Sequence, residues 1–180
     1  MTATNPFFDI SLLPYQAPHF DEITDDHYRP AFDEALRQKR ADVDAIVSQT
    51  AAPDFTNTVL ALEKSGAMLS RVSSVFFAMT SANTNTYLQE LEEQFSTELA
   101  ALANDIWLND VLFARVESVW QDRAALDAES RRLAEETYQR FILAGARLNE
   151  TEKAELKALN TEAATLTSQF NQRLLAADKT

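Results

Sequence analysis

The sequence predicts an all-α fold, with about six mostly antiparallel helices in a bundle-like array, preceded by an irregular, proline-rich arm. Only two glycines, Gly66 and Gly145, occur in 180 residues. Glycine supplies the positive-φ conformations that hairpins and phosphate-binding loops require, so these folds are disfavoured. Apolar residues recur at steps of three and four through most of the chain, which is the period of a helix face.

The first 23 residues are predicted to form an extended arm that packs along the helices, with residues 24–180 as the helical domain. Pro6, Pro14 and Pro18 prevent a regular helix in the arm. A disordered tail is the alternative. The expected apolar anchors of the arm are Phe7, Phe8, Leu12, Leu13, Tyr15 and Phe20.

Helices are expected at about 24–48, 56–81, 85–108, 110–126 and 127–148, and from 149 to beyond 174. Thr24 and Asp127 are predicted N-caps. Asn149, followed three residues later by Glu152, resembles a capping box. Gly66 falls inside the second helix, where it costs about 1 kcal/mol of helix propensity. It is expected to permit close helix approach or to mark a local bend.

Two apolar stripes are the clearest amphipathic signals. Both are expected to face the core. The stripe of the third helix is Leu88, Leu91, Phe95, Leu99, Leu102 and Ile106, and that of the sixth is Leu156, Leu159, Ala163, Leu166, Phe170 and Leu174.

Charge and composition argue against several classes of partner and site. The formal net charge of −12 argues against nucleic-acid binding and against an anionic membrane surface. The absence of cysteine excludes disulfides and thiolate metal sites and fits a reducing compartment. The start of the chain has no signal-peptide pattern, and no apolar run approaches the ~18 residues of a membrane span. The expected location is the cytoplasm.

Residues able to carry chemistry are scarce. His19 and His27 are the only histidines, and neither belongs to an H-E-x-x-H zinc motif. A nucleophile elbow and a phosphate-binding loop are also absent. The carboxylates Glu90, Glu92, Glu93 and Glu98 are expected on a solvated helix face. The sequence therefore predicts no catalytic residues, no cofactor-binding residues and no metal ligands in this chain.

Aromatic residues are expected mainly in the core. Trp107 and Trp120 are expected to be partly exposed, where they would mark an interface. The others that fall in or beside helical stripes are Phe76, Phe77, Phe95, Phe113, Phe141 and Phe170.

Several stretches together resemble a known family. They are YRPAFDE at 28–34, PDFTNTVLALE at 53–63, NDIWLN at 104–109, LFARV at 112–116 and LNTEAATLTSQFN at 159–171. In this order and spacing they are similar to the N-terminal region of bacterial peptidyl-dipeptidases. These enzymes belong to the thimet oligopeptidase-like family of zinc metallopeptidases. The resemblance covers essentially all 180 residues, although none of the pieces is a catalytic signature.

The resemblance implies a role in a longer enzyme. Family members are helical ellipsoids split by a channel, where H-E-x-x-H and a downstream glutamate hold zinc, and peptidyl-dipeptidases release dipeptides from the C-termini of short peptides. The chain is then expected to be an N-terminal part, inactive alone, that contributes channel wall and a size filter. Its expected partners are the rest of the enzyme, short peptides in the channel and a second copy of itself. A self-standing helical protein-interaction module is the alternative.

Overall fold

A computed structural model describes residues 5–178, and every regular element in that range is a helix. The all-α prediction is therefore confirmed. The longer helices are α1 (Asp25–Val47), α3 (Ala67–Ala82), α4 (Thr86–Trp107), α5 (Asp110–Gln121), α6 (Ala128–Leu143) and α7 (Glu150–Asp178). The shorter ones are η1 (Pro14–Gln16), η2 (Phe55–Leu60), α2 (Ala61–Lys64) and η3 (Arg123–Ala125).

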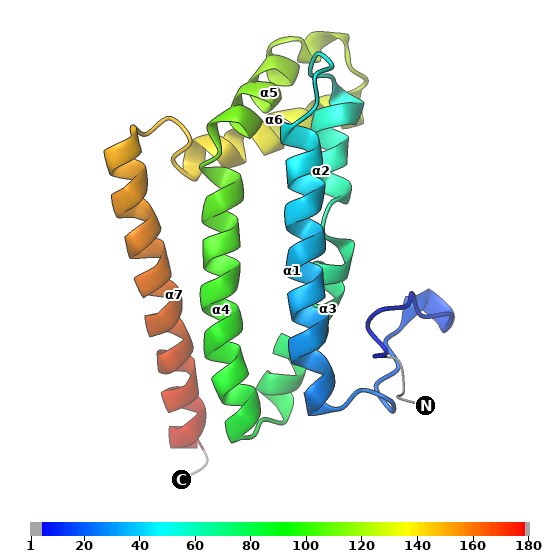
Figure 1. The fold of residues 1–180 in the computed structure, drawn as a ribbon, viewed down its shortest axis with the longest axis vertical. Helices are drawn as coiled ribbons and strands as arrows, with labels where there is room; N and C mark the ends of the chain where they lie inside the picture. Colours follow the sequence, from blue (N-terminus) through cyan, green and yellow to red (C-terminus); the bar gives the residue numbers. More distant parts are fainter. Residues whose placement is uncertain (1–4, 179–180) are drawn as a thin grey trace.

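The long helices form a broad array with a cap at one end (Figure 1). Helix α1 runs up, α3 returns beside it, α4 runs up again, and α7 descends along the outer side of α4. Helices α5 and α6 pack on each other and cross the upper end. Successive long helices are therefore mostly antiparallel, as predicted.

Side-chain caps begin several helices where the sequence indicates. The carboxylate of Asp127 accepts from the backbone N–H groups of Glu129 and Ser130, both at 3.0 Å. Asn149 and Glu152 exchange the two hydrogen bonds of a capping box, at 2.9 and 3.0 Å. These bonds satisfy N–H groups that the helix itself leaves unpaired.

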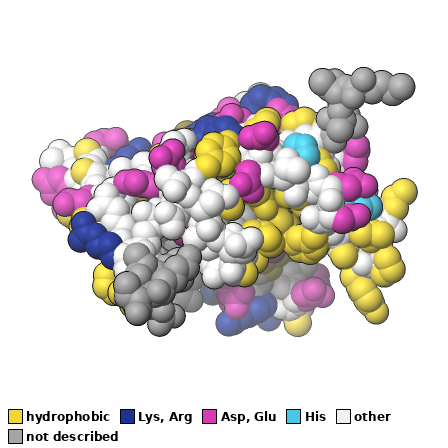
Figure 2. Space-filling model, turned by 90° about the horizontal axis from the view of Figure 1, so that it is seen from below, with side chains coloured by type: hydrophobic (Ala, Val, Ile, Leu, Met, Phe, Trp, Pro, Cys, Tyr) yellow, Lys and Arg dark blue, Asp and Glu magenta, His cyan; other side chains and the backbone are white. Residues whose placement is uncertain are grey.

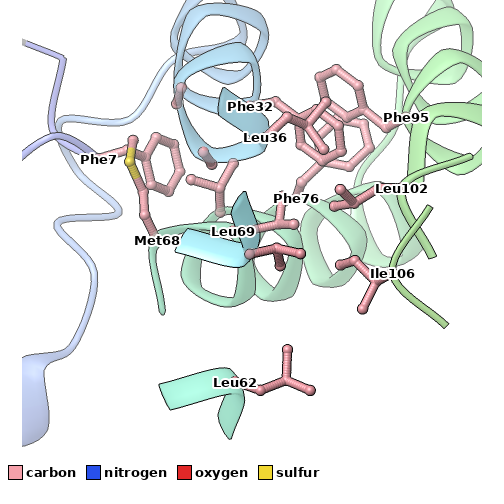
Figure 3. Packing of buried hydrophobic residues seen from close by; sticks show 14 of the residues in the cluster. Phe7, Phe32, Leu36, Leu62, Met68, Leu69, Phe76, Phe95, Leu102 and Ile106 are labelled. Atoms are coloured by element: carbon pink, nitrogen blue, oxygen red, sulfur yellow. The ribbon is translucent and has the colours of Figure 1, made fainter. Parts of the chain in front are cut away.

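Aromatic rings from three helices form the centre of the core. The rings of Phe32 on α1 and Phe95 on α4 stack at 3.8 Å, and Phe76 on α3 meets Phe95 edge-on at 4.8 Å. Figure 3 shows these rings gathered between the helices, with Phe7 entering from the arm beside Met68. The apolar stripe of α4 thus packs as predicted.

The predicted helix over 56–81 is wrong as one continuous element. Its first part is the wide π-helical turn η2, and α2 ends at Lys64. Gly66 then takes φ 75°, in the left-handed region where glycine has no steric penalty, and α3 begins after it. A Cβ at this position would lie 2.6 Å from the Cδ atom of Lys39. Gly66 therefore serves both the bend and a close approach.

Two other helices end earlier than predicted. Helix α5 stops at Gln121 instead of 126, because the chain turns through η3 before Asp127 caps α6. Helix α6 stops at Leu143 instead of 148, because Gly145 takes φ 94°. The N–H of Ala146 then bonds the carbonyl of Phe141 at 3.0 Å, the usual closure of a helix C-terminus.

The arm is anchored at one aromatic side chain. Phe7 is 2% exposed, and its carbonyl accepts from Arg71 at 2.8 Å. The other five expected anchors remain exposed. Figure 2 shows hydrophobic side chains projecting on the side where the arm lies in Figure 1. No helix in the described range is both long enough and apolar enough to cross a membrane.

Candidate docking surface

Helix α7 packs on α4 through polar side chains. Ser168 of α7 lies within this contact, and only 4% of its surface is exposed. Three hydrogen bonds from α7 to α4 cross the seam: Asn160 to the Asn104 side chain (2.7 Å), Gln169 to the Glu93 carboxylate (3.2 Å) and Gln172 to the Gln89 carbonyl (2.9 Å). We call this contact the α4–α7 seam.

The first turn of α7 is held by a buried cation. The side chain of Lys153 is 6% exposed, and its ammonium pairs with Asp110 at the start of α5. Glu150 lies 3.9 Å from the same ammonium. A buried lysine needs such a partner because an unpaired charge is costly away from water. This ion pair therefore fixes the N-terminal end of α7 against the start of α5.

The opposite side of α7 is apolar and uncovered. We define the α7 outer face by four large side chains that are more than half exposed. They are Leu159 (62%), Leu166 (57%), Phe170 (65%) and Leu174 (59%). At 100° per residue, Phe170 points about 200° away from Ser168. The predicted core stripe of this helix is therefore wrong, because α7 turns its polar side inward.

The face that α4 offers explains this reversal. The apolar stripe of α4, including Leu88 and Phe95, is buried in the main core with α1 and α3. What remains for α7 is the side that carries Gln89, Glu93 and Asn104. Polar side chains on α7 match that surface, so its leucines face outward.

The α7 outer face has the dimensions of a helix-packing surface. Leu159 and Leu174 are fifteen residues apart, or about 22 Å along the axis. Full burial of one such side chain contributes about 1.5–3 kcal/mol. A large contiguous apolar patch is typical of an interaction site, so we identify the outer face as a candidate docking surface.

The arm presents a second apolar surface, on the side of the array away from α7 (Figure 1). Leu12 and Tyr15 are almost fully exposed. Tyr15 and Gln16 have φ values of 60° and 56°, which are unusual for residues other than glycine. The arm tip therefore combines exposed apolar groups with a strained backbone.

The carboxylates of α4 depart from the solvated face that the sequence predicts. Glu98 binds Arg29 of α1 at 2.7 Å, and Glu93 belongs to the α4–α7 seam. The hydrogen bonds that Arg29 donates to Glu98 and then to Asp33 raise the pKa of Arg29. Burial raises the pKa of the Glu92 carboxyl. Of the four carboxylates, Glu90 alone is exposed rather than partly buried.

The described residues do not fit a zinc site. Within them, no three histidine, cysteine, aspartate or glutamate side chains gather closely enough to hold a metal ion. The Nδ1 atom of His27 accepts the backbone N–H of Thr24 at 3.1 Å, within the cap of α1. His19 lies eight residues earlier in the arm. The absence of catalytic and metal residues stays a prediction.

Both tryptophans lie half-buried beneath an arginine. The guanidinium carbon of Arg140 is 4.2 Å from the ring centre of Trp107, and that of Arg123 is 4.2 Å from Trp120. Trp107 also meets Phe141 edge-on at 4.9 Å. Their partial exposure agrees with the prediction.

Sequence reasoning missed the polar seam, although a signal was present. Asn160, Ser168 and Gln172 lie at multiples of four along the helix and therefore share one face. A periodic polar stripe usually faces solvent. Only the polar surface of α4 reveals that this one is packed.

Comparison with known proteins identifies relatives. No family model matches the chain. The chain is 68% identical over 179 residues to the dipeptidyl carboxypeptidase of Salmonella typhimurium and 65% identical over 181 residues to that of Escherichia coli. These matches cover 98% and 99% of this chain. Oligopeptidase A of Escherichia coli is 23% identical over 97% of the chain.

The matched region is a small share of each relative. It covers 26% and 27% of the two dipeptidyl carboxypeptidases and 25% of oligopeptidase A. The resemblance that the sequence indicates is confirmed. The chain is therefore a relative of the bacterial dipeptidyl carboxypeptidases and corresponds to about a quarter of their length.

Proposed function

We propose that this chain is the N-terminal helical region of a zinc metallopeptidase that removes C-terminal dipeptides from short peptides. In that enzyme the chain forms part of the wall of the channel, whereas the residues that hold zinc and carry out the reaction lie outside this chain. The names of the two relatives above 60% identity support the reaction. The lack of an H-E-x-x-H motif in the 180 residues supports the division of labour.

The α7 outer face carries this proposal. A helix that turns its polar side inward and exposes Leu159, Leu166 and Phe170 is suited to packing on both sides. About three quarters of each relative lies outside the matched region, and that part is the occupant we assign to the face. The arm tip is a second contact with the same occupant.

The channel-wall role rests on the arrangement of the long helices. Helices α1, α4 and α7 lie side by side and form a broad surface (Figure 1). A rigid wall of this kind excludes folded proteins and admits short flexible peptides, which would make it a size filter. The cytoplasmic location expected from the cysteine-free sequence stays a prediction.

Fragment complementation tests the proposal. The Salmonella relative lacking its matched quarter is prepared alone and mixed with this chain, and release of dipeptides from a quenched peptide is measured. We expect recovery of activity with the unsubstituted chain and loss of recovery with Leu166→Glu and Phe170→Glu. Leu143→Glu, at an exposed leucine of α6, is the matched control.

Assay of the isolated chain tests the division of labour. The 180-residue chain with added zinc is expected to show no turnover of the quenched peptide. Metal-dependent turnover that a chelator abolishes would overturn the proposal. Failure of complementation, with a stable partner found for the chain alone, would favour the self-standing interaction module.

A further inference from the structure

A cavity of about 670 Å³ lies between the Gly66 bend and helices α4 and α6. Its size is within the usual range for small-molecule sites. The bend creates it, because α2 and α3 do not continue as one helix across this region. The cavity lies away from the α7 outer face, and the proposed function does not use it.

The cavity lining combines apolar and polar side chains. The apolar part, which we call the floor, consists of Leu62, Leu69, Leu99, Leu102, Ile106 and Trp107. The polar part, which we call the rim, includes Ser70, Ser73 and Thr137 and the charged side chains of Lys39, Arg140, Glu63 and Glu136. Such a division is typical of sites that bind an apolar body and orient it through one polar group.

Arg140 is the cation best placed to hold a ligand. Its guanidinium lies over Trp107 at 4.2 Å, and within the described residues no hydrogen bond or ion pair engages it. Glu136, one turn earlier, is paired instead with Arg132 at 2.7 Å. An aromatic-backed guanidinium with free N–H groups is suited to a planar carboxylate.

Lys39 adds a second positive charge near the rim. Its ammonium donates to the carbonyl of Ser65 at 3.2 Å. Burial lowers the pKa of Lys39 and Arg140 lowers it further, while Asp42 and Glu63 act in the opposite direction. The rim therefore holds the cations Lys39 and Arg140 together with the carboxylates Glu63 and Glu136, and Glu136 pairs with Arg132 outside the lining.

We propose that this cavity binds a small organic carboxylate with an apolar body. The carboxylate meets Arg140, and the body rests on the leucines of the floor. This site is independent of peptide hydrolysis and of the α7 outer face. It assigns a function to the Gly66 bend beyond the break between α2 and α3.

Fluorescence of Trp107 reads this site directly. In a Trp120→Phe chain, Trp107 is the single tryptophan. N-Acetylphenylalanine is titrated against N-acetylphenylalaninamide, which has the same body without the charge. We expect a saturable change with the acid and about tenfold weaker binding of the amide, a change of about 1.4 kcal/mol that is near the lower end of what a hydrogen bond to a charged group contributes.

Two substitutions on α6 separate the site from general charge. Arg140→Gln is expected to weaken binding of the acid about tenfold, whereas Arg131→Gln, at a residue that lies outside the cavity lining and bonds the carbonyl of Leu126, leaves it within about twofold. Calorimetric titration of the unsubstituted chain with the same acid shows whether Trp120→Phe itself alters the binding. Equal binding of acid and amide, equal loss in both arginine variants, or no saturable binding by either method would overturn the proposal.

Discussion

The side-chain amide of Asn160 on α7 donates to the amide oxygen of Asn104 on α4 at 2.7 Å, across a seam with polar side chains on both sides. Asn104 is buried and also donates to the carbonyl of Lys157 at 3.5 Å. This pair holds α7 with its polar side inward and its leucines outward. The docking surface is a consequence of the seam.

Removal of this contact should loosen α7 specifically. Asn104→Ala is expected to lower the free energy of unfolding by about 0.5–1.5 kcal/mol, because the hydrogen bonds of Asn104 with Asn160 and with the Lys157 carbonyl are lost. Hydrogen exchange should accelerate along α7 more than along α1. Asn171→Ala, at an exposed position of α7, is the control. Unchanged exchange in α7 after Asn104→Ala would contradict the seam.

The isolated chain should associate with itself through the α7 outer face. An uncovered apolar stripe of about 22 Å favours contact with another copy when its usual occupant is absent. Sedimentation velocity should show concentration-dependent association that Leu166→Ser with Phe170→Ser abolishes. The free energy of unfolding should change by no more than about 0.5 kcal/mol, as for surface positions. A strict monomer at high concentration of the unsubstituted chain would oppose this prediction.

Substitution by alanine of two phenylalanines, each from an apolar helical stripe, should lower the stability of the chain by very different amounts. Phe95 is fully buried and stacks on Phe32, so Phe95→Ala is expected to cost about 3–5 kcal/mol of stability. Phe170 is 65% exposed, and Phe170→Ala is expected to cost less than about 0.5 kcal/mol in the isolated chain. Urea denaturation measures both. Similar losses for the two variants would show that α7 packs the other way round.

The Glu34 carboxyl provides a test by titration. Hydrogen bonds from Arg37, at 2.7 and 2.8 Å, and from Gln38 lower the pKa of Glu34 from 4.5 to about 2. A lowered carboxyl pKa contributes stability that is present above about pH 4.5 and is lost as the pH falls through about 2. This contribution is small because the group is exposed.

Carbon-detected NMR of the Glu34 side chain measures the pKa. Arg37→Gln should return it toward 4.5, while Arg132→Gln on α6 should leave it unchanged. A Glu34 pKa near 4.5 in the unsubstituted chain would contradict the described ion pair.

The sequence predicts the positions of most helices well, but it predicts the buried face correctly for some helices and not for others. The apolar periodicity correctly predicts the position of α4 and the burial of Phe95, because an apolar stripe beside other apolar stripes has only one favourable orientation. The same pattern failed for Phe170, since the burial of a stripe depends on what the neighbouring helix offers. Gly66 was recognised as a point of weakness, but its left-handed conformation was not predictable from periodicity alone. The polar stripe that includes Asn160 is visible in the sequence, but it does not indicate packing on Asn104, because polar residues in helices usually face solvent.

Thiol labelling at position 170 measures whether the α7 outer face is covered in the longer protein. The chain has no cysteine, so Phe170→Cys supplies one reporter on the α7 outer face, and Gln139→Cys on α6 supplies an exposed control. Each is placed in the 180-residue chain and in the Salmonella relative whose matched quarter is replaced by this chain. Labelling rates are followed by mass spectrometry of the reporter peptide. We expect fast labelling at position 170 in the short chain and strong protection in the long protein, because the α7 outer face is exposed in the first and covered in the second. Equally fast labelling in both would contradict this expectation.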